Sequence, residues 1–481
     1  MRRDPLVEAF DRLVKRRTGP PIVVSQRGSV TPVEIDRAAR SIGRLVRDTG
    51  IDPGAPLGVV AGNGAGFLAI LLAGLRLGHA PILIDRQVTD LELHRVLERL
   101  DAGGHVRCVA AFSRGTQAFR IERRSRRTRD RLHTRSPAVI KLTSGSTGSP
   151  RGILTSTEAL LSDDEALDRS MEIRSSDRLL AAVPFSHSYG LSSLVLPALV
   201  RGAPLVVPEP TGIFAPLEAA RDFGATIFPT VPAYLAALLR VSGAPPLVDS
   251  VRRVISAGAR LMPEVAAGFR ERFGRGVHAF YGASECGGIA YDPTGTAAER
   301  ETVGTPVSGV RVDLEAVDGL PADRCRRIVV RSPAVADGYL PDRDARLGGG
   351  LFVSDDLGVR RDDELALVGR LNRLINVRGN KVDPTEVERV ISELSVVDEV
   401  RVVGVVNEKT GDHRVSVVVA CRPGAVSPDE IRAWCRGRLS GFKLPRSIHV
   451  LERIPRDERG KVDRASLARL ARASSPRPKR G

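Results

Sequence analysis

Short apolar runs alternate with longer helical stretches through the N-terminal part of the chain. Residues 57–61 and 81–84 have the length and apolar character of buried strands, and residues 67–75 between them form an apolar run of helical length. The same order recurs at 179–183, 191–200 and 205–207, and again at 253–257, 263–273 and 277–280. Continuous apolar strands separated by helices are typical of parallel sheets covered on both faces. The pattern therefore predicts an α/β fold.

The pattern changes near residue 370. A helix is predicted from Asp383, strands at 400–406 and 414–420, and a second helix at 428–439. These elements suffice for a separate α+β domain of ordinary size. We therefore expect a large N-terminal domain at 1–371, with mostly parallel sheets layered with helices, and a small mobile C-terminal domain at 372–481. Its tail after Leu470 is basic and rich in Pro and Ser, and we expect it to be disordered.

The chain is strongly basic, with 73 Lys+Arg against 57 Asp+Glu in 481 residues and a net charge of +16. Such a charge is typical of nucleic-acid-binding proteins. Only seven of the 73 basic residues are lysine, however, so the charge reflects arginine use along the whole chain and predicts no nucleic-acid partner. The arginine run at 123–135 is expected to be an exposed loop, and a surface for an acidic partner is the alternative.

Cysteine usage and hydropathy indicate the compartment. The five cysteines contain no C-x-x-C pair and are odd in number, which argues against a disulfide framework or a zinc site. The most apolar stretch, residues 67–77, is too short to span a bilayer, and the N-terminus lacks the apolar core of a signal peptide. We expect a cytoplasmic protein without a membrane span.

The most specific segment for function runs from Ile140 to Gly152. It is a short strand followed by a loop rich in hydroxyls and glycines, with a cation at Arg151. Glycines let backbone N–H groups approach an anion, and hydroxyls add donors. The segment therefore predicts a phosphate-binding loop. It does not fit the pattern G-x-x-x-x-G-K-[ST] of the Walker loop, and a plain Ser/Gly surface loop is the alternative.

Four later segments accompany this loop. They are Tyr281–Glu285, similar to Tyr-Gly-x-Thr-Glu; Ser354–Asp356, similar to Thr-Gly-Asp; the hinge-like segment Gly369–Gly379; and Pro455–Arg464, similar to a catalytic-lysine segment. With these segments in this order, the chain resembles the adenylate-forming (AMP-binding) superfamily of acyl-CoA synthetases, luciferases and peptide-synthetase adenylation domains. One such match is weak evidence because short motifs give false positives, but five in family order are strong.

The resemblance implies ATP, Mg²⁺ and coenzyme A as cofactors and gives roles to single residues. Glu285 would bind Mg²⁺, Ser284 would contact the α-phosphate, and Lys461 would drive adenylation. These roles fit the reaction, because a carboxylate that attacks the α-phosphate brings two anions together, and cations are needed to neutralise their charge. The β- and γ-phosphates would be held by Thr143, Ser144, Gly145, Ser146, Thr147, Gly148 and Arg151.

The same resemblance places the rest of the nucleotide and the thiol. Adenosine would lie against Gly258, Ala259, Tyr281, Gly282, Asp356 and Arg370. Asp356 would accept hydrogen bonds from both ribose hydroxyls, as an acceptor-only carboxylate can. Asn372 would be the hinge between the domains, and Gly379 would line a narrow tunnel for pantetheine.

The acid substrate is indicated by a second group of residues. His187 resembles the histidine that lines the carboxylate pocket of acyl-CoA ligases, and no acidic residue lies between 178 and 209 to pair with an α-ammonium group. Amino acids are therefore disfavoured. Small residues at the pocket walls would suit an apolar chain or ring, so fatty and aryl acids both remain open; these residues are Val231, Ala283, Gly287 and Gly288.

The resemblance favours one reaction and leaves alternatives. The expected enzyme is an AMP- and pyrophosphate-forming acyl-CoA ligase of fatty or aryl acid metabolism. An acyl-AMP ligase that loads a carrier protein is less favoured, because the interval between Glu285 and Asp356 is short for its insertion. A nucleotide-binding member without ligase activity is a further alternative, since Asp355 and Asn372 depart from the family pattern. A dinucleotide-binding fingerprint fails, because its third glycine would fall on Phe67.

Overall fold

A computed structural model describes the chain at residues 4–16, 19–110, 112, 118–124, 138–144, 150–209, 212–317, 320, 325–371, 375–377, 380–382, 384–406, 413–436, 438–439, 441–456 and 462–473. The chain divides into two compact units. The first contains residues 1–313, 329–354 and 360–366, and the second contains 314–328, 355–359 and 367–481. The expected boundary at residue 371 stays a prediction.

The first unit contains a nine-stranded sheet. Its spatial order is β15 (Thr305–Pro306), β14 (Gly287–Tyr291), β13 (Val277–Ala283), β12 (Arg253–Ser256), β11 (Ile227–Thr230), β9 (Leu179–Leu180), β10 (Leu205–Val206), β1 (Val23–Ser25) and β2 (Gly28–Val30). The strands from β13 to β1 pair in parallel, whereas β14, β15 and β2 add antiparallel edges.

The first unit also contains a seven-stranded sheet. Its order is β18 (Gly338–Leu340), β8 (Pro150–Ser156), β7 (Ala138–Ser144), β4 (Ala80–Ile84), β3 (Pro56–Val60), β5 (Gly104–Cys108) and β6 (Phe119–Arg123). The central strands β7, β4, β3 and β5 are parallel. The outer pairs β7–β8, β8–β18 and β5–β6 are antiparallel. The α/β prediction is confirmed, with parallel pairing at the centre of both sheets.

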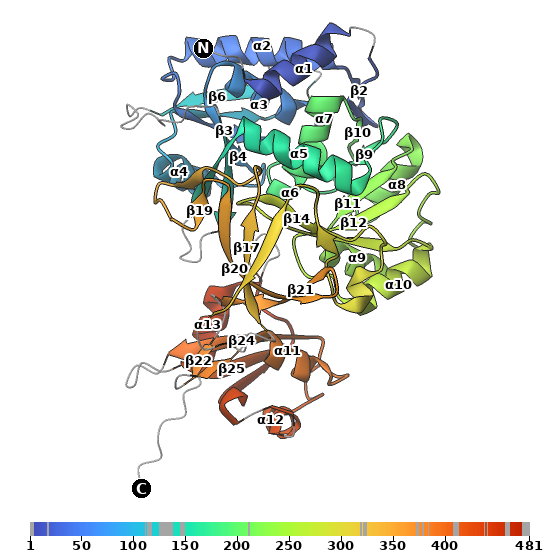
Figure 1. Cartoon of the computed structure of the whole chain (residues 1–481), viewed down its shortest axis with the longest axis vertical. Helices are drawn as coiled ribbons and strands as arrows, with labels where there is room; N and C mark the ends of the chain where they lie inside the picture. The colour runs from blue at the N-terminus through green and yellow to red at the C-terminus, as the bar shows by residue number, and fades with distance from the viewer. Residues whose placement is uncertain are drawn as a thin grey trace. The chain divides into compact units, whose positions relative to one another are not determined.

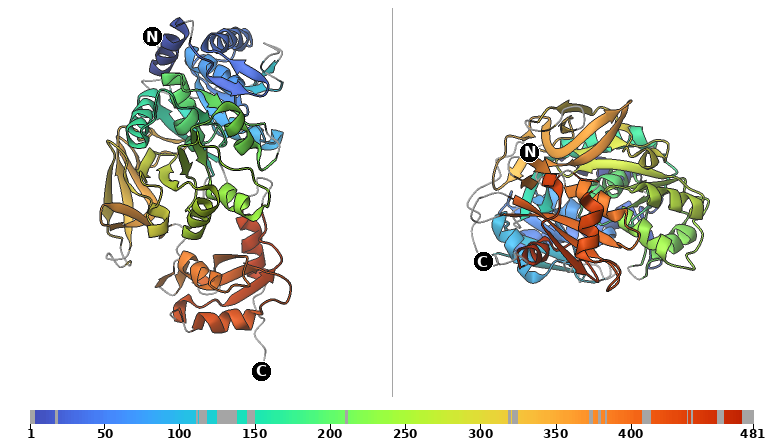
Figure 2. Two further views of the ribbon diagram at one scale, coloured as in Figure 1. Left: turned by 90° about the vertical axis from the view of Figure 1, so that its right-hand side faces the viewer. Right: turned by 90° about the horizontal axis from the view of Figure 1, so that it is seen from below.

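Helices cover these sheets. Their bounds are α1 (Pro5–Lys15), α2 (Pro32–Asp48), α3 (Ala65–Arg76), α4 (Asp90–Arg99), α5 (Thr157–Met171), α6 (Ser188–Gly190), η2 (Leu191–Val195), α7 (Leu196–Arg201), α8 (Ala215–Phe223), α9 (Pro232–Arg240), α10 (Pro263–Phe273) and η3 (Ala297–Arg300). Helices α1, α2 and α3 pack together (Figures 1 and 2). Thr31 and Glu34 form a capping box that begins α2. The predicted helix at 191–200 begins as the π-helical turn η2.

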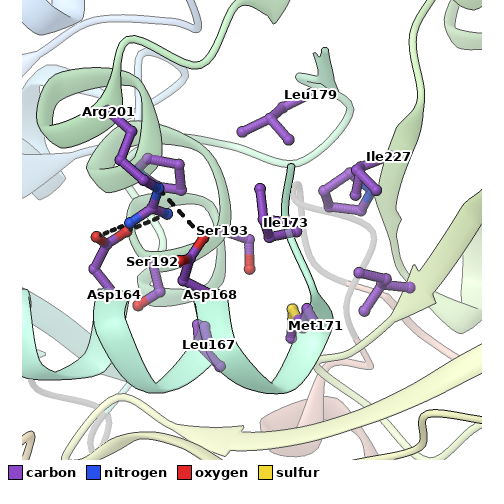
Figure 3. A pocket seen from close by; sticks show the side chains of 13 residues that line it. Asp164, Leu167, Asp168, Met171, Ile173, Leu179, Ser192, Ser193, Arg201 and Ile227 are labelled. Atoms are coloured by element: carbon purple, nitrogen blue, oxygen red, sulfur yellow. Dashed lines mark hydrogen bonds and ion pairs between the residues drawn. The ribbon is translucent and has the colours of Figure 1, made fainter. Parts of the chain in front are cut away.

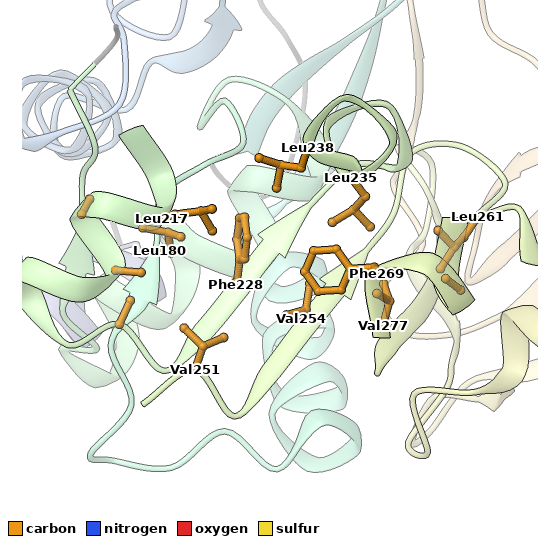
Figure 4. Close-up of a cluster of buried hydrophobic side chains, with 14 of the residues drawn as sticks. Leu180, Leu217, Phe228, Leu235, Leu238, Val251, Val254, Leu261, Phe269 and Val277 are labelled. Carbon is orange, nitrogen blue, oxygen red and sulfur yellow. The ribbon is translucent and has the colours of Figure 1, made fainter. Parts of the chain in front are cut away.

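A hydrophobic cluster stabilises the half of the nine-stranded sheet that leads to the predicted site. Phe228 on β11, Leu235 on α9 and Phe269 on α10 are fully buried in it (Figure 4). Leu238 on α9 and Val254 on β12 complete the same layer. This packing fixes the helices that follow β11 and β12, and so fixes the ends of those strands.

A further sheet was not expected from the sequence. Its order is β16 (Arg311–Glu315), β17 (Arg326–Arg331), β20 (Leu351–Arg361) and β19 (Leu347–Gly348), with β21 (Glu364–Arg370) paired to β20. Its strands are less uniformly buried than those of the two larger sheets. They therefore lack the continuous apolar runs on which the sequence prediction depended.

The second unit contains the predicted C-terminal α+β elements. They are β22 (Ile375–Val377), β23 (Asn380–Val382), α11 (Pro384–Ser392), β24 (Glu399–Val406), β25 (His413–Ala420), α12 (Pro428–Arg436), η5 (Gly441–Lys443), β26 (Ser447–Leu451) and α13 (Arg464–Ala473). Strands β24, β25 and β26 form one sheet. The expectation of disorder from Leu470 was wrong at its start, because α13 continues to Ala473 and buries Ala471. The rest of the tail lies outside the described residues.

The arginine run at 123–135 begins in ordered structure. Arg123 ends β6, and Arg124 donates hydrogen bonds from Nη1 to the backbone oxygens of Leu97 (2.6 Å) and Ala102 (3.2 Å). The loop expectation was therefore wrong for Arg123, which belongs to β6 and donates to the backbone oxygen of Thr49 at 3.3 Å, whereas Arg124 lies just after the strand. Residues 125–135 lie outside the described part of the chain.

Candidate functional site

Three neighbouring parallel strands end where predicted site residues begin. Strand β11 is followed by Val231, β12 by Gly258 and Ala259, and β13 contains Tyr281 before it ends at Ala283. Crevices outside the carboxyl ends of parallel strands are the usual ligand sites of open α/β sheets. The Cβ position of Gly258 is 3.9 Å from Val231 Cγ1, so the predicted adenine wall and the predicted acid pocket adjoin each other.

The turn between β13 and β14 carries Ser284 and Glu285. Gly287 closes this turn with φ +70°, and a Cβ there would lie 2.2 Å from Asp163 Oδ1. Only glycine fits both the backbone conformation and the space. The pairing register also shifts between Tyr281 and Gly282, which marks a local irregularity next to the turn. The hydroxyl of Ser284 and the carboxylate of Glu285 thus project from one tight turn.

Tyr339 on β18 links this turn to the seven-stranded sheet. Its hydroxyl donates to Glu285 Oε1 at 3.0 Å, and the guanidinium of Arg151 on β8 lies 4.0 Å from the centre of its ring. Burial, and next the negative charge of Glu285, raise the pKa of Tyr339 well above its usual range, so the phenol remains a donor. One tyrosine therefore connects a predicted phosphate-binding cation with the predicted magnesium ligand.

Sequence reasoning missed Tyr339, and its signal is weak. It follows Gly338 in a short strand with no apolar periodicity, and it lies far along the chain from Glu285. A second contact fixes the same turn, because the backbone oxygen of Glu285 accepts a 2.8 Å hydrogen bond from the N–H of Ala336. Residues before and on β18 therefore hold Glu285 by both its backbone and its side chain.

The segment after His187 contacts the same turn. Ser188 Oγ donates to Ser284 Oγ at 2.8 Å. Tyr189 OH donates to the backbone oxygen of Ile255 at 2.8 Å, and its ring lies 5.7 Å from that of Phe280. His187 itself is exposed and immediately precedes α6. The structure thus brings the His187 segment beside Ser284, as a carboxylate pocket next to an α-phosphate contact requires.

The small residues of the predicted acid pocket are explained in part by the protein itself. A Cβ on Gly288 would lie 2.6 Å from Leu167 and 3.1 Å from Phe280, and Asp163 fills the corresponding space at Gly287. Their small size makes room for these side chains. Ala283 lies at the end of β13 and Val231 after β11, and both stay candidates for substrate contact.

A small cavity between α5, η2 and β11 is separate from the predicted acid pocket. Figure 3 shows Arg201 turned toward Asp164 and Asp168, with Leu179 and Ile227 on the other side of the cavity. Arg201 forms a two-pronged ion pair with Asp164 and lies 3.4 Å from Asp168 Oδ1. The cavity is lined by these charged groups, by Ser192 and Ser193 and by apolar residues, and by no predicted substrate residue.

The structure describes the predicted phosphate-binding loop only at its two ends. Thr143 on β7 pairs with Arg151 on β8. The backbone of Ser144 ends β7 opposite Pro150. Gly145, Ser146, Thr147 and Gly148 lie outside the described residues. The two strands therefore bring the ends of the loop together, with Arg151 at the start of the return strand.

The predicted ribose contacts lie in the second unit. Arg370 Nε donates a hydrogen bond to Asp356 Oδ1, so these residues pair as the resemblance implies. Lys461, Asn372 and Gly379 lie outside the described residues, and their roles stay predictions.

Glu285 suits a magnesium ion held together with a nucleotide. Magnesium is usually bound by one or two carboxylates plus substrate phosphates and waters. Tyr339 occupies one carboxylate oxygen, which leaves the other available to a cation, and Arg151 lies on the same tyrosine. Among the described residues, no group of three or more His, Cys, Asp or Glu could hold a metal by itself. In the same part of the chain, no helix is long and apolar enough to cross a membrane.

Comparison with protein families gives two matches. Residues 10–340 match the model of the AMP-binding enzymes, and residues 386–461 match that of the AMP-binding enzyme C-terminal domain. Together the matches contain the β13–β14 turn, Arg151 and Lys461.

Three curated relatives are CoA ligases or synthases by name. The sulfoacetate–CoA ligase of Cupriavidus necator is 31% identical over 342 residues, covering 69% of this chain and 67% of that protein. The 4-coumarate–CoA ligase-like 4 of Oryza sativa is 28% identical over 360 residues, covering 72% and 65%. The feruloyl-CoA synthase of an Amycolatopsis species is 26% identical over 466 residues, covering 92% and 94%.

Solved structures share the fold. The amide bond synthetase McbA of Marinactinospora thermotolerans superposes with a TM-score of 0.78 at 26% identity, covering 97% of this chain and 99% of that one. The o-succinylbenzoate CoA synthetase of Bacillus subtilis, solved with ATP and a magnesium ion, gives 0.79 at 21% identity, covering 95% and 98%.

Proposed function

Because the chain belongs to the AMP-binding enzyme family, we propose that it activates a carboxylic acid with ATP and transfers the acyl group to coenzyme A. In the first step the carboxylate attacks the α-phosphorus, which forms acyl-AMP and releases pyrophosphate. In the second step the thiol of CoA attacks the acyl carbon, which forms the thioester and releases AMP. The β13–β14 turn carries the proposal, because it presents Ser284 and Glu285 beside the His187 segment and Tyr339.

The chain's own residues have distinct parts in the first step. Arg151, held against Tyr339, would neutralise the departing phosphates, and Ser284 would donate to the α-phosphate oxygen. Mg²⁺ on Glu285 would supply charge neutralisation at the phosphates. Lys461 would place a compact ammonium between the carboxylate and the α-phosphate as negative charge develops.

The proposed acid is an aryl or small carboxylic acid. The names of the curated relatives, with 4-coumarate, ferulate and sulfoacetate as their acids, support this class. Leu167 and Phe280 occupy space behind Gly288, which leaves less room for a long chain there. The family membership alone does not require fatty acid metabolism. The five free cysteines fit a reducing compartment, and we place the enzyme in the cytoplasm.

An amine is the second candidate acceptor. The amide bond synthetase McbA is 26% identical over almost the whole chain, so acyl-AMP could be captured by an amine in place of a thiol. The phosphopantetheine thiol of a carrier protein is a third candidate acceptor, and its reaction with acyl-AMP is the same as that of the CoA thiol. The first half-reaction is common to all three.

ATP–pyrophosphate exchange with a panel of aryl, short-chain and long-chain acids tests the first step. We expect exchange with at least one aryl or small acid, dependent on Mg²⁺ and abolished by EDTA. AMP release is then measured with CoA, with simple amines and with a pantetheinylated carrier protein. Thioester formation with CoA supports the proposal, and amide formation favours the second candidate. Absence of exchange with every acid contradicts adenylation altogether.

Asp356→Ala is expected to raise the KM for ATP by about tenfold with a smaller effect on the KM for the acid. The reason is the loss of hydrogen bonds to a charged acceptor, worth about 1.5 kcal/mol or more. Exchange kinetics at varied ATP concentration measure it. Asp355→Ala, which removes the neighbouring carboxylate, is the control. A rise in the KM for ATP only in the Asp355 variant would place the ribose contact on the wrong residue.

A further inference from the structure

Asp163 on α5 is a buried acid in an apolar stripe. It is 3% exposed and lies one helical turn from Leu160 and Leu167, which are also buried. The helix pattern predicts an apolar residue at such a position. A buried carboxylate is costly unless it is hydrogen-bonded and paired with a cation. Helix formation alone therefore does not explain Asp163, and the proposed reaction has not used it.

The carboxylate of Asp163 joins two segments that are distant in sequence. Its Oδ2 accepts a hydrogen bond from Ser192 Oγ at 2.5 Å, and its Oδ1 accepts one from the N–H of Gly288 at 2.9 Å. Ser192 belongs to η2, which follows His187, and Gly288 follows the turn that carries Glu285. Because Gly287 has no side chain, the turn approaches the carboxylate closely.

Lys141 on β7 is a buried basic residue that acts electrostatically on Asp163. It is 4% exposed, and Asp163 and then Glu285 are the strongest anions acting on it. Burial lowers the pKa of Lys141, and these anions oppose that effect. Burial raises the pKa of Asp163, whereas Ser192, Gly288 and Lys141 oppose it. Both oxygens of Asp163 accept a hydrogen bond, so donors from two segments hold the carboxylate.

A second link runs parallel to the first. Ser188 Oγ donates to Ser284 Oγ at 2.8 Å, one helical turn before Ser192. The segment from Ser188 to Ser192 is therefore tied to the β13–β14 turn at both of its ends. One tie is direct, and the other passes through Asp163.

We propose that Asp163 is a positioning residue whose buried carboxylate fixes the His187 segment relative to the turn carrying Ser284 and Glu285. This inference rests on the proposed function, because it concerns the alignment of an acid at His187 with a phosphate at Ser284. Displacement of reacting groups by about 1 Å can lower a rate by about 10²-fold. Asp163 thus acts on the rate without contact with either substrate.

The test compares two neighbouring aspartates on the same helix. Asp163→Asn keeps the size of the side chain but replaces one of its two acceptor oxygens with a donor. The control is Asp164→Asn, which alters an equally buried carboxylate that pairs with Arg201 and does not contact the turn. In ATP–pyrophosphate exchange, Asp163→Asn should lower kcat by about 10- to 100-fold and raise the KM for the acid, with the KM for ATP within about twofold of wild type. Asp164→Asn should change the melting temperature without changing these constants.

The single variant Ser192→Ala keeps the inference testable if Asp163→Asn folds poorly. Ser192→Ala removes one hydrogen bond to the carboxylate and should lower kcat by about threefold to tenfold. Where Asp163→Asn folds, the double variant should be no slower than Asp163→Asn alone, because Ser192 acts on the turn only through the carboxylate of Asp163.

Two results would overturn the inference. The first is unchanged exchange constants in both Asp163→Asn and Ser192→Ala. The second is an equal loss of kcat in Asp163→Asn and Asp164→Asn in proportion to their loss of melting temperature, which indicates a structural role only. Failure of the proposed function is distinguishable, because wild type itself would then show no exchange with any acid.

Discussion

Lys461→Ala is expected to lower kcat for adenylation by about 10²- to 10³-fold, the usual effect of removing a donor aimed at charge that develops in the transition state. ATP–pyrophosphate exchange measures this loss. Thioester formation from preformed acyl-adenylate and CoA should change far less, because the lysine acts on the first step. Lys461→Arg should restore only part of the rate, since a planar guanidinium does not replace a compact ammonium.

Arg453→Ala is the matched control for Lys461. Arg453 is an exposed cation in the same C-terminal segment and has no part in the proposed reaction. Its loss changes the net charge by the same amount, and exchange should remain at the wild-type level. Full exchange by Lys461→Ala would contradict a role of this lysine in adenylation. Equal losses of exchange in Lys461→Ala and Arg453→Ala would indicate a general effect of charge.

Glu285→Gln is expected to lower kcat/KM for exchange by about 10²-fold and to shift its dependence on Mg²⁺ to higher concentrations. Glutamine keeps the size of the side chain and an oxygen for Tyr339, but it lacks the charge that a magnesium ligand supplies. Exchange measured over a series of Mg²⁺ concentrations, together with the melting temperature, separates lost metal affinity from lost stability.

The control for Glu285 is Glu301→Gln. Glu301 lies on the surface, where it pairs with Arg260 at 2.9 Å and with Arg361 at 3.6 Å, and it has no part in the proposed reaction. It should leave the magnesium dependence unchanged. An unchanged magnesium dependence in Glu285→Gln as well would contradict the assignment of Glu285 as metal ligand, even if activity fell.

Apolar continuity decided which parts of the fold were predictable. Strands β3 and β4 are buried along their whole length, so their sequences are continuous apolar runs, which predict a sheet covered on both faces. Strand β16 is as long as β3 and β4, but it contains Arg311, Asp313 and Glu315 and has one fully buried position, so it carries little signal. The π-helical start of the predicted helix at 191–200 and the contacts of Ser188 and Ser192 beside it are features that periodicity does not report.

The candidate site was predictable where chemistry is local in sequence. Ser284, Glu285 and Arg151 lie in motifs, and each can be recognised with its neighbours. Tyr339 and Asp163 gain their importance from partners that are distant along the chain. Nothing within the helix 157–171 distinguishes Asp163, which faces Gly288, from Asp164, which faces Arg201. Only the folded arrangement separates their roles.

The stack of Arg151 on Tyr339 also bears on the use of arginine at this position. A guanidinium is planar and can lie on an aromatic face, whereas an ammonium on a flexible chain is held less firmly there. The side chain is therefore ordered when the protein folds, and in the proposed role its rotamer entropy would not be lost again on nucleotide binding. Arginine at this position makes the enzyme's cation preorganised, so Arg151→Lys would be a change in flexibility as much as in chemistry.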